Sequence, residues 1–331
     1  MSRNLDVVGI GNALVDILTH VEEDFLVCHG IEKGIMQLVN LDRAAELYGL
    51  IEHADRACGG SAANTVASLA GMGMRTAFIG KTKEDDLGRV FTADFARLNA
   101  ICPTQPAPAS VGFETGRCTI LVTPDGERSM NTYLGAAEHL GPDDIDEAMI
   151  ENSDWVYLEG YRFDGAEGQE AFHKAVHSCR RAGVKSALTL SDPFCVFRHR
   201  AGFLDLIEEG IDLLFCNRAE LLAMAQTDDL DLALNETSDL VDIVACTLAQ
   251  DGAIVARGNQ RMSVPAYDVQ LVDATGAGDL FAAGFLFGLI RDMDLTRCAE
   301  LGCAAAAEIV SQMSARCDAD LMTRFRAYGL I

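Results

Sequence analysis

Residues 155–190 read WVYLEGYRFDGAEGQEAFHKAVHSCRRAGVKSALTL, and this stretch decides the fold. Two short apolar runs, Trp155–Leu158 and Ala187–Leu190, enclose a helical pattern over Glu167–Ala182. A strand, a helix and a second strand in this order are typical of two parallel strands joined by a crossover helix. The stretch therefore predicts one unit of a parallel sheet.

The same alternation continues along most of the chain. Further strands are expected at Val7–Ile10, Thr76–Ile79, Leu213–Cys216, Ile243–Cys246 and Ala253–Ala256. Further helices are expected at Ser61–Gly71 and Phe203–Glu209. We predict an α/β fold with a doubly wound, mainly parallel sheet flanked by helices.

Two segments depart from this alternation. Thr119–Val122 and Arg128–Tyr133 are joined by Pro124-Asp125-Gly126, which supplies the residues typical of a turn, so they predict a β-hairpin. Met36–Val39 is a similar short strand. We expect a small β lid, contributed by residues of about 13–40 and 112–135, within one domain that spans residues 1–331.

Polar residues follow five of the expected strands at the point where each strand ends. They are Asn12, Glu159, Asp192, Asn217 and Thr247. Each residue alone is more typical of a turn or a cap than of a ligand. Because ligands bind outside the carboxyl ends of the strands in open α/β sheets, the five together predict one site on one edge.

Composition limits the possible partners. The 331 residues are 49% hydrophobic and 23% charged, and the longest apolar stretch, Leu280–Ile290, is far shorter than a membrane span. Leu5–Ile10 is too short for the apolar core of a signal peptide, so we expect a soluble, cytoplasmic protein. The formal net charge of −24 argues against nucleic acid or an anionic membrane as a partner.

The cysteines do not indicate a metal site or a disulfide framework. Eleven cysteines are scattered from Cys28 to Cys317 without a Cys-x-x-Cys pair, and most of them lie inside apolar runs. We interpret them as small buried thiols in a reducing compartment.

The segment Asp273-Ala274-Thr275-Gly276-Ala277-Gly278-Asp279 carries the clearest chemistry. The glycines allow backbone amides to point at one anion, and the apolar helix that follows adds the positive end of its dipole. Asp279 in the first turn would then lie beside the bound anion. The alternative is a plain glycine-rich turn with an aspartate cap.

The same segment resembles the C-terminal signature of the ribokinase-like (PfkB) carbohydrate and nucleoside kinases. Cys58-Gly59-Gly60-Ser61-Ala62-Ala63-Asn64 resembles the N-terminal signature of that family, about 215 residues earlier in the chain. The resemblance covers almost the whole chain and looks closest to adenosine kinases. The segments that suggest this are Gly11–Ile17, Leu190–Phe194 and Gly126–Ser129, with Asn12 where the sugar kinases commonly have glutamate.

The resemblance implies transfer of the γ-phosphoryl group of ATP to the 5′-hydroxyl of a nucleoside, namely adenosine to AMP, as in purine salvage. Asp279 is then the catalytic base, and the transferring phosphoryl group is held by Gly276, Ala277, Gly278 and Arg128 of the lid. The nucleoside is bound by Asn12, Asp16, Gly59, Gly60, Ser61, Asn64, Leu134 and Tyr161. Of these residues, Asn12, Asp16, Gly60 and Asn64 suit the hydroxyls of a ribose. Leu134 and Tyr161 match the positions that sandwich the base in adenosine kinases.

On the ATP side, the resemblance implies contacts from Asn217, Thr247, Gly252, Thr275, Gly276, Gly278, Ala304 and Ala307. Asn217 and Glu220 are expected to hold Mg²⁺. The same pair also fits the capping box of a helix, and both interpretations can hold at once. K⁺ is a further candidate cofactor, although Ala274 replaces a threonine that is common in the signature.

Several alternatives remain open from the sequence. The nearest are a kinase for ribose or fructose, or for inosine or guanosine. A non-catalytic nucleoside sensor is the alternative from a different class. A dinucleotide oxidoreductase is weaker, because the Gly9-Ile10-Gly11 start lacks the third glycine of the fingerprint. Both a monomer and a dimer fit the sequence.

Overall fold

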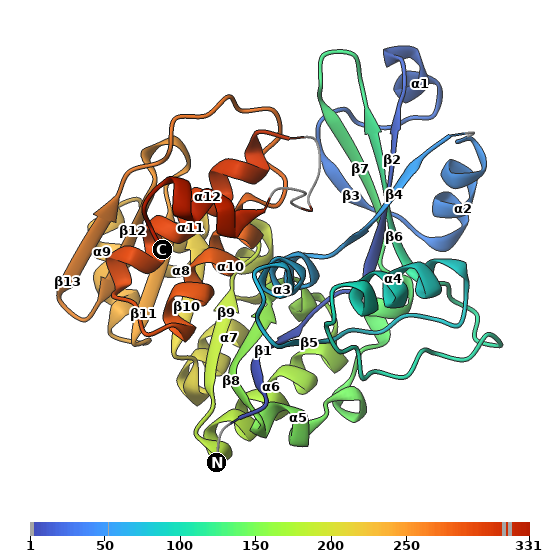
Figure 1. The fold of residues 1–331 in the computed structure, drawn as a ribbon. Coiled ribbons are helices and arrows are strands. Elements are labelled where there is room, and N and C mark those ends of the chain that lie inside the picture. The colour runs from blue at the N-terminus through green and yellow to red at the C-terminus, as the bar shows by residue number, and fades with distance from the viewer. Residues whose placement is uncertain (1–2, 52, 313–315, 317–319) are drawn as a thin grey trace.

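The computed structural model describes residues 3–51, 53–312, 316 and 320–331 and contains two β-sheets (Figure 1). The main sheet has the strand order β13-β12-β11-β10-β9-β8-β1-β5. Its strands are β1 (Leu5–Ile10), β5 (Thr76–Ile79), β8 (Ser153–Glu159), β9 (Lys185–Thr189), β10 (Leu213–Asn217), β11 (Ile243–Thr247), β12 (Ala253–Arg257) and β13 (Gln260–Val264). The pairs from β5 to β11 are parallel, whereas β12 and β13 are antiparallel.

The second sheet, which we call the lid sheet, has the order β3-β7-β6-β2-β4. Its strands are β2 (Leu14–His20), β3 (Met36–Leu38), β4 (Asp55–Gly59), β6 (Gly116–Val122) and β7 (Arg128–Tyr133). The sheet projects away from the main layers (Figure 1). Sequence patterns did not predict β4, because this strand is polar and short and takes its place only by pairing with β2.

Helices cover both faces of the main sheet. They are α3 (Ser61–Gly71), α4 (Asp86–Arg97), α5 (Glu147–Glu151), α6 (Ala166–Ala182), α7 (Pro193–Gly210), α8 (Arg218–Ala225), α9 (Leu230–Ser238), α10 (Ala277–Ile290), α11 (Leu295–Val310) and α12 (Leu321–Ala327), while α1 (Glu23–Cys28) and α2 (Leu41–Gly49) accompany the lid sheet. Alternate residues of β1 enter different cores: Val7 packs with residues of α3 and α10, and Val8 with residues of α6 and α7. This two-sided burial explains the nearly continuous apolar runs of the parallel strands.

The predicted fold class is confirmed, with differences in detail. Helix α7 begins at Pro193, ten residues before the expected start at Phe203, because the Asp192 carboxylate caps it by accepting the N–H of Cys195. Of the described cysteines, Cys28 is exposed and Cys102 is half-buried, whereas the others are buried, and Cys317 lies outside the described residues. No described helix combines the length and the apolar character that a membrane crossing requires.

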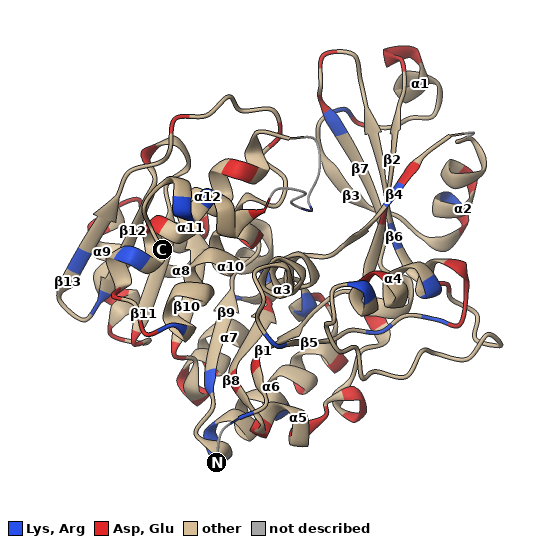
Figure 2. Ribbon diagram, viewed as in Figure 1, with Lys and Arg blue, Asp and Glu red and all other residues tan. Residues whose placement is uncertain are grey.

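Charged side chains lie on many elements of the molecule. Figure 2 shows acidic residues spread over the lid sheet, the helices and the loops rather than gathered on one element. The acidic excess is therefore a general property of the surface, and local arrangements decide which charges a ligand meets.

Candidate active site

The carboxyl ends of five neighbouring parallel strands meet at one edge of the main sheet. Strands β1, β8, β9, β10 and β11 are adjacent and parallel, so the polar residues that follow them lie along the same edge. This arrangement confirms the edge expected from the sequence. The turn before α10 and the first turn of α3 reach the same region, because side chains of α3 bond to Asp279.

The turn before α10 combines a left-handed glycine with the start of a helix, which are two features expected from the sequence. Gly276 adopts φ 80°, a left-handed conformation that favours glycine, and α10 starts at the next residue. The Asp273 carboxylate shapes the turn, since its Oδ1 atom accepts from the N–H and the hydroxyl of Thr275 at 3.1 and 2.8 Å. The N–H of Ala277 donates to the carbonyl of Ala274 at 3.2 Å, so it serves the turn itself.

Asp279 receives hydrogen bonds from α3, a helix more than 200 residues earlier in the chain. The Ser61 hydroxyl donates to its Oδ1 atom at 2.6 Å, and Nδ2 of Asn64 donates to Oδ2 at 3.0 Å. The Thr65 hydroxyl donates to its backbone carbonyl at 3.1 Å. Burial raises the pKa of Asp279 to about 6, and the bonds from Ser61 and Asn64 act in the opposite direction.

Two more polar groups lie close to Asp279, on Asn64 and on Asp16. The Oδ1 atom of Asn64 is buried and has no hydrogen-bond partner in the described structure. Asp16, on β2, lies against Gly59, where an added Cβ atom would come within 2.4 Å of its carboxylate. Burial raises the pKa of Asp16 to about 6, while the positive charges of Arg316 and Arg128 favour its ionised form. Both groups can bind hydroxyls, the amide oxygen as an acceptor and the carboxylate as a stronger one.

One row of paired residues crosses the lid sheet from Asp16 to Leu38. Asp16 pairs with Cys118, Cys118 with Thr132, and Thr132 with Leu38, so the four side chains share one face of the sheet. Leu38 is 56% exposed. No sequence pattern assigns Leu38 to the site, because a residue in a short strand carries no signal until the register of its strand is known.

The two residues expected to sandwich a base lie at the ends of β7 and β8. Leu134 follows β7 directly and is half-buried. Tyr161 donates its N–H to the Ser191 hydroxyl at 3.2 Å and its own hydroxyl to the Ser191 carbonyl at 3.3 Å. Burial raises the pKa of Tyr161 well above its ordinary value. These bonds hold the ring of Tyr161 close to Ser191, just after the carboxyl end of β9.

Asn12 and Glu159 form a buried pair beside the first turn of α3. The Nδ2 atom of Asn12 donates to Oε1 of Glu159 at 2.7 Å, and burial raises the pKa of Glu159 to about 7. Asn12, expected to contact a substrate, therefore already uses one N–H of its side-chain amide within the protein. Glu159 appeared in the sequence only as one of five polar strand ends, and its partner could not be read there.

Apart from the turn before α10, the residues expected on the nucleotide side lie at the ends of β10 and β11, at the start of α8, just before β12 and in α11. Asn217 and Glu220 form the predicted capping box: Asn217 donates its N–H and its Nδ2 to the two oxygens of Glu220 at 2.9 and 2.6 Å, and its Oδ1 accepts the N–H of Glu220. Thr247 donates its hydroxyl to the Cys216 carbonyl at 3.5 Å.

Gly252, Ala304 and Ala307 have structural reasons for their small size. Gly252 adopts φ 91°, and an added Cβ atom would lie 2.0 Å from the carbonyl of Val264. Ala304 and Ala307 are buried in α11, where helices α10 and α11 pack closely together. Their burial alone accounts for small side chains at these positions.

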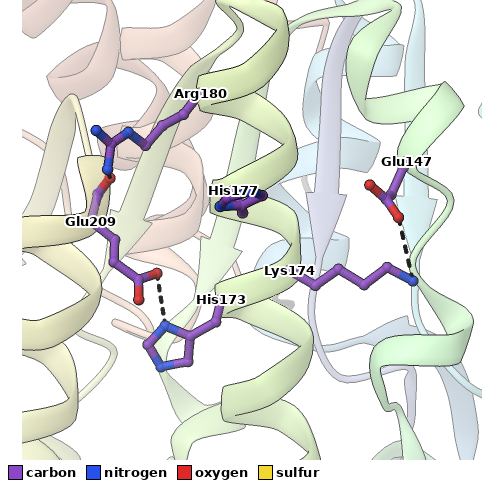
Figure 3. A pocket seen from close by; sticks show the side chains of 6 residues that line it. All are labelled: Glu147, His173, Lys174, His177, Arg180 and Glu209. Carbon is purple, nitrogen blue, oxygen red and sulfur yellow. Dashed lines mark hydrogen bonds and ion pairs between the residues drawn. The ribbon is translucent and has the colours of Figure 1, made fainter.

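A separate cavity of about 490 Å³ lies on the outer side of α6 (Figure 3). It is lined by Glu147, His173, Lys174, His177, Arg180 and Glu209. Its lining groups already contact one another, since His173 bonds to Glu209 at 2.8 Å and Lys174 lies 3.7 Å from Glu147. None of these residues belongs to the edge that carries Asp279.

Residues 27–320 match the pfkB family of carbohydrate kinases. The chain belongs to this family. A PfkB-family kinase transfers a phosphoryl group to an alcohol, so the predicted class of enzyme is confirmed, and family membership implies ATP as the donor.

The relatives of this PfkB kinase differ in the acceptor for which they are named. A probable sugar kinase from Rhizobium etli CFN 42 is 40% identical, with a TM-score of 0.92 and coverage of 100% of both chains. An adenosine kinase from Sinorhizobium meliloti is 43% identical, with a TM-score of 0.90 and coverage of 98% of this chain and 99% of that one. An ATP-dependent ribose-1-phosphate kinase from Halopiger xanaduensis is 32% identical over 286 residues, which are 84% of this chain and 89% of that protein. The names of these relatives therefore do not fix the acceptor of this kinase.

Proposed function

We propose that this PfkB kinase phosphorylates the 5′-hydroxyl of a nucleoside, and that its acceptor is adenosine, which it converts to AMP. The observation that carries the choice of acceptor is the row across the lid sheet. It places the carboxylate of Asp16 and the exposed apolar side chain of Leu38 on one face. A ribose that carries a flat apolar base needs both features, whereas a free sugar presents hydroxyls and needs no exposed apolar surface. This activity would place the enzyme in cytoplasmic purine salvage.

In this proposal, Asp16 and Asn64 bind the ribose hydroxyls and Asp279 accepts the hydrogen bond of the reacting hydroxyl. Asp279 orients that hydroxyl in line with the phosphoryl group and takes its proton late. Its modest basicity suffices, because phosphoryl transfer depends mostly on positioning and charge stabilisation. The N–H groups of Gly278 and Asp279 hold the transferring group, because the N–H of Ala277 bonds to the carbonyl of Ala274.

Mg²⁺ fits the Asn217–Glu220 pair through water. Each carboxylate oxygen of Glu220 already accepts one hydrogen bond from Asn217 and has one lone pair left for a further donor. Burial raises the pKa of Glu220 to about 7, with the negative charge of Asp192 adding to the effect, and a nearby cation would favour the charged carboxylate. No described group of three acidic, histidine or cysteine side chains forms a protein-only metal site. The ion would therefore be held by ATP phosphates and water, with Glu220 orienting the water. K⁺ beside the turn at Ala274 remains a further candidate.

A second candidate is a ribose 1-phosphate or similar phosphorylated sugar as acceptor. The positive charges of Arg316 and Arg128 both act on Asp16, so a cationic environment exists close to the proposed hydroxyl site. The relative from Halopiger xanaduensis is named for this acceptor.

The deciding measurement is kcat/KM for a panel of acceptors with ATP and Mg²⁺. The panel contains adenosine, inosine, guanosine, ribose, ribose 1-phosphate and fructose, and ADP release is the readout. We expect adenosine to give the highest value. A higher value for ribose 1-phosphate would replace the acceptor, and no ADP release with any of them would favour a nucleoside sensor.

Two substitutions test the assigned roles. Asp279→Asn should lower turnover about 10²–10⁴-fold while leaving nucleoside binding largely intact. Leu38→Asp should lower kcat/KM for adenosine at least about tenfold and leave activity on ribose-type acceptors unchanged. Leu240→Asp is the matched control, because Leu240 is a similarly exposed leucine (42%) outside the lid sheet.

A further inference from the structure

A buried carboxylate under the proposed acceptor site joins two segments that are distant in the sequence. Glu159, the last residue of β8, is 1% exposed. Its Oε2 atom accepts the N–H of Ala62 at 2.9 Å and the N–H of Asn12 at 3.3 Å, and its Oε1 atom accepts Nδ2 of Asn12 at 2.7 Å. All three partners are donors, so the arrangement fits a group that only accepts, as an ionised carboxylate does.

The side chain of Asn12 connects Glu159 to a buried arginine. Arg162 donates from Nη1 to Oδ1 of Asn12 at 3.5 Å and from Nη2 to the carbonyl of Leu140 at 2.9 Å. The amide of Asn12 therefore has one defined orientation, with its nitrogen toward the carboxylate and its oxygen toward the guanidinium. The opposite orientation would place donor against donor at one end and acceptor against acceptor at the other.

The network also contacts the first turn of α3, because Oε2 of Glu159 accepts the N–H of Ala62 there. Ala62 lies in the first turn of α3, between Ser61 and Asn64, which both donate to Asp279. The two glycines beside the network pack closely against it. An added Cβ atom at Gly11 would lie 2.4 Å from Oε2 of Glu159, and one at Gly60 would lie 2.1 Å from the carbonyl of Asn12.

We propose that Glu159 is a positioning residue for phosphoryl transfer. Through the N–H of Ala62 and through Asn12, it sets the place at which α3 presents Ser61 and Asn64 to Asp279. Asn12 acts as the link between Glu159 and Arg162 rather than as a ligand of the substrate. This inference rests on the proposed role of Asp279 as the base, because Glu159 acts only through the donors that hold Asp279.

The fixed orientation of the Asn12 amide gives a swap experiment. Glu159→Gln replaces one acceptor by a donor that faces the Asn12 nitrogen, and we expect kcat to fall about 10–100-fold with KM for ATP unchanged. Asn12→Asp places two carboxylates side by side and should have a similar effect. In the double variant, the new amide nitrogen at position 159 donates to the new carboxylate at position 12, which still accepts from Arg162. We expect kcat to return to within about threefold of the wild type.

Asp6→Asn is the matched control for general destabilisation. Asp6 is also buried on the main sheet and accepts from the N–H and the Nε of Arg75 at 2.7 and 3.1 Å, but it lies near the opposite end of β1. It should lower Tm without lowering kcat. Thermal unfolding is measured for every variant beside kcat and KM.

Three results would overturn the proposal. The first is a Glu159→Gln variant whose kcat stays within about threefold of the wild-type value. The second is a loss of kcat in Asp6→Asn that matches its loss of Tm, and the third is a double variant that recovers Tm but not kcat. If Glu159→Gln does not fold, the double variant decides alone. Failure of the proposed base is recognised separately, because Asp279→Asn would then keep its turnover.

Discussion

Arg128 and Asp273 form a buried ion pair that joins the lid sheet to the turn before α10. Nη1 of Arg128 lies 2.8 Å from Oδ2 of Asp273, and the two side chains are 6% and 10% exposed. The other oxygen of Asp273 accepts both bonds from Thr275. One carboxylate thus folds the proposed phosphate turn and ties it to the lid. The expected role of Arg128 at the phosphoryl group stays a prediction, and its guanidinium lies on Asp273 in this structure.

Asp273→Asn should destabilise the protein substantially. The amide can still accept from Thr275, but the buried Arg128 loses a counter-charge, so we expect the free energy of unfolding to fall by about 3 kcal/mol. Urea unfolding of Asp273→Asn, Arg128→Met and the double variant measures the coupling between the two residues. A coupling energy near zero would show that the ion pair does not hold the lid.

Gly278→Ala should separate catalysis from stability. An added Cβ atom at this position meets no heavy atom within 4 Å, and the residue lies in the first turn of α10. Alanine favours a helix by up to about 1 kcal/mol over glycine, so Tm should stay constant or rise slightly. The methyl group would occupy space proposed for the phosphoryl group, and kcat/KM for ATP should fall at least about tenfold. Unchanged activity would remove this turn from the proposed site.

Ser61→Ala should move the acidic limb of the pH–rate profile to higher pH. Asp279 must be ionised to accept the hydroxyl proton, and burial raises its pKa to about 6, so kcat/KM should rise with pH through that value. The bond from Ser61 lowers this pKa, and its removal raises the pKa further. Ser68→Ala, two turns along α3, is the control and should leave the limb in place. A shift toward lower pH in Ser61→Ala contradicts the assignment.

Asp16→Asn should become more stable than the wild type as the pH rises. Burial raises the pKa of Asp16 from 3.8 to about 6 in the folded protein. A carboxyl group with a raised pKa stabilises the fold at low pH, and this contribution is lost as the pH rises through about 6. The asparagine of the variant does not titrate, so the variant does not lose this contribution. Its free energy of unfolding should rise by up to about 3 kcal/mol relative to that of the wild type between pH 4 and pH 8. Chemical unfolding at both pH values checks this, and a constant difference between the two proteins would disprove it.

The main sheet could be predicted because its strands carry a local signal. β5 and α3 were predicted with their observed bounds, since apolar runs between helices identify strands that are buried on both faces. Strand β4 and the start of α7 could not be predicted in the same way. The first depends on pairing with β2, and the second depends on the cap that Asp192 provides.

For the site, the sequence by itself determined the chemistry that is encoded in neighbouring residues. The glycine-rich turn, the aspartate that follows it and the Asn217–Glu220 cap are local patterns, because backbone conformation and capping act over a few residues. Only the tertiary structure decided which of these groups meet. The approach of Ser61 and Asn64 to Asp279, the link from Glu159 through Asn12 to Arg162, and the alignment of Leu38 with Asp16 all join residues that are far apart in the chain. Such contacts depend on strand register and helix packing, which no local pattern encodes.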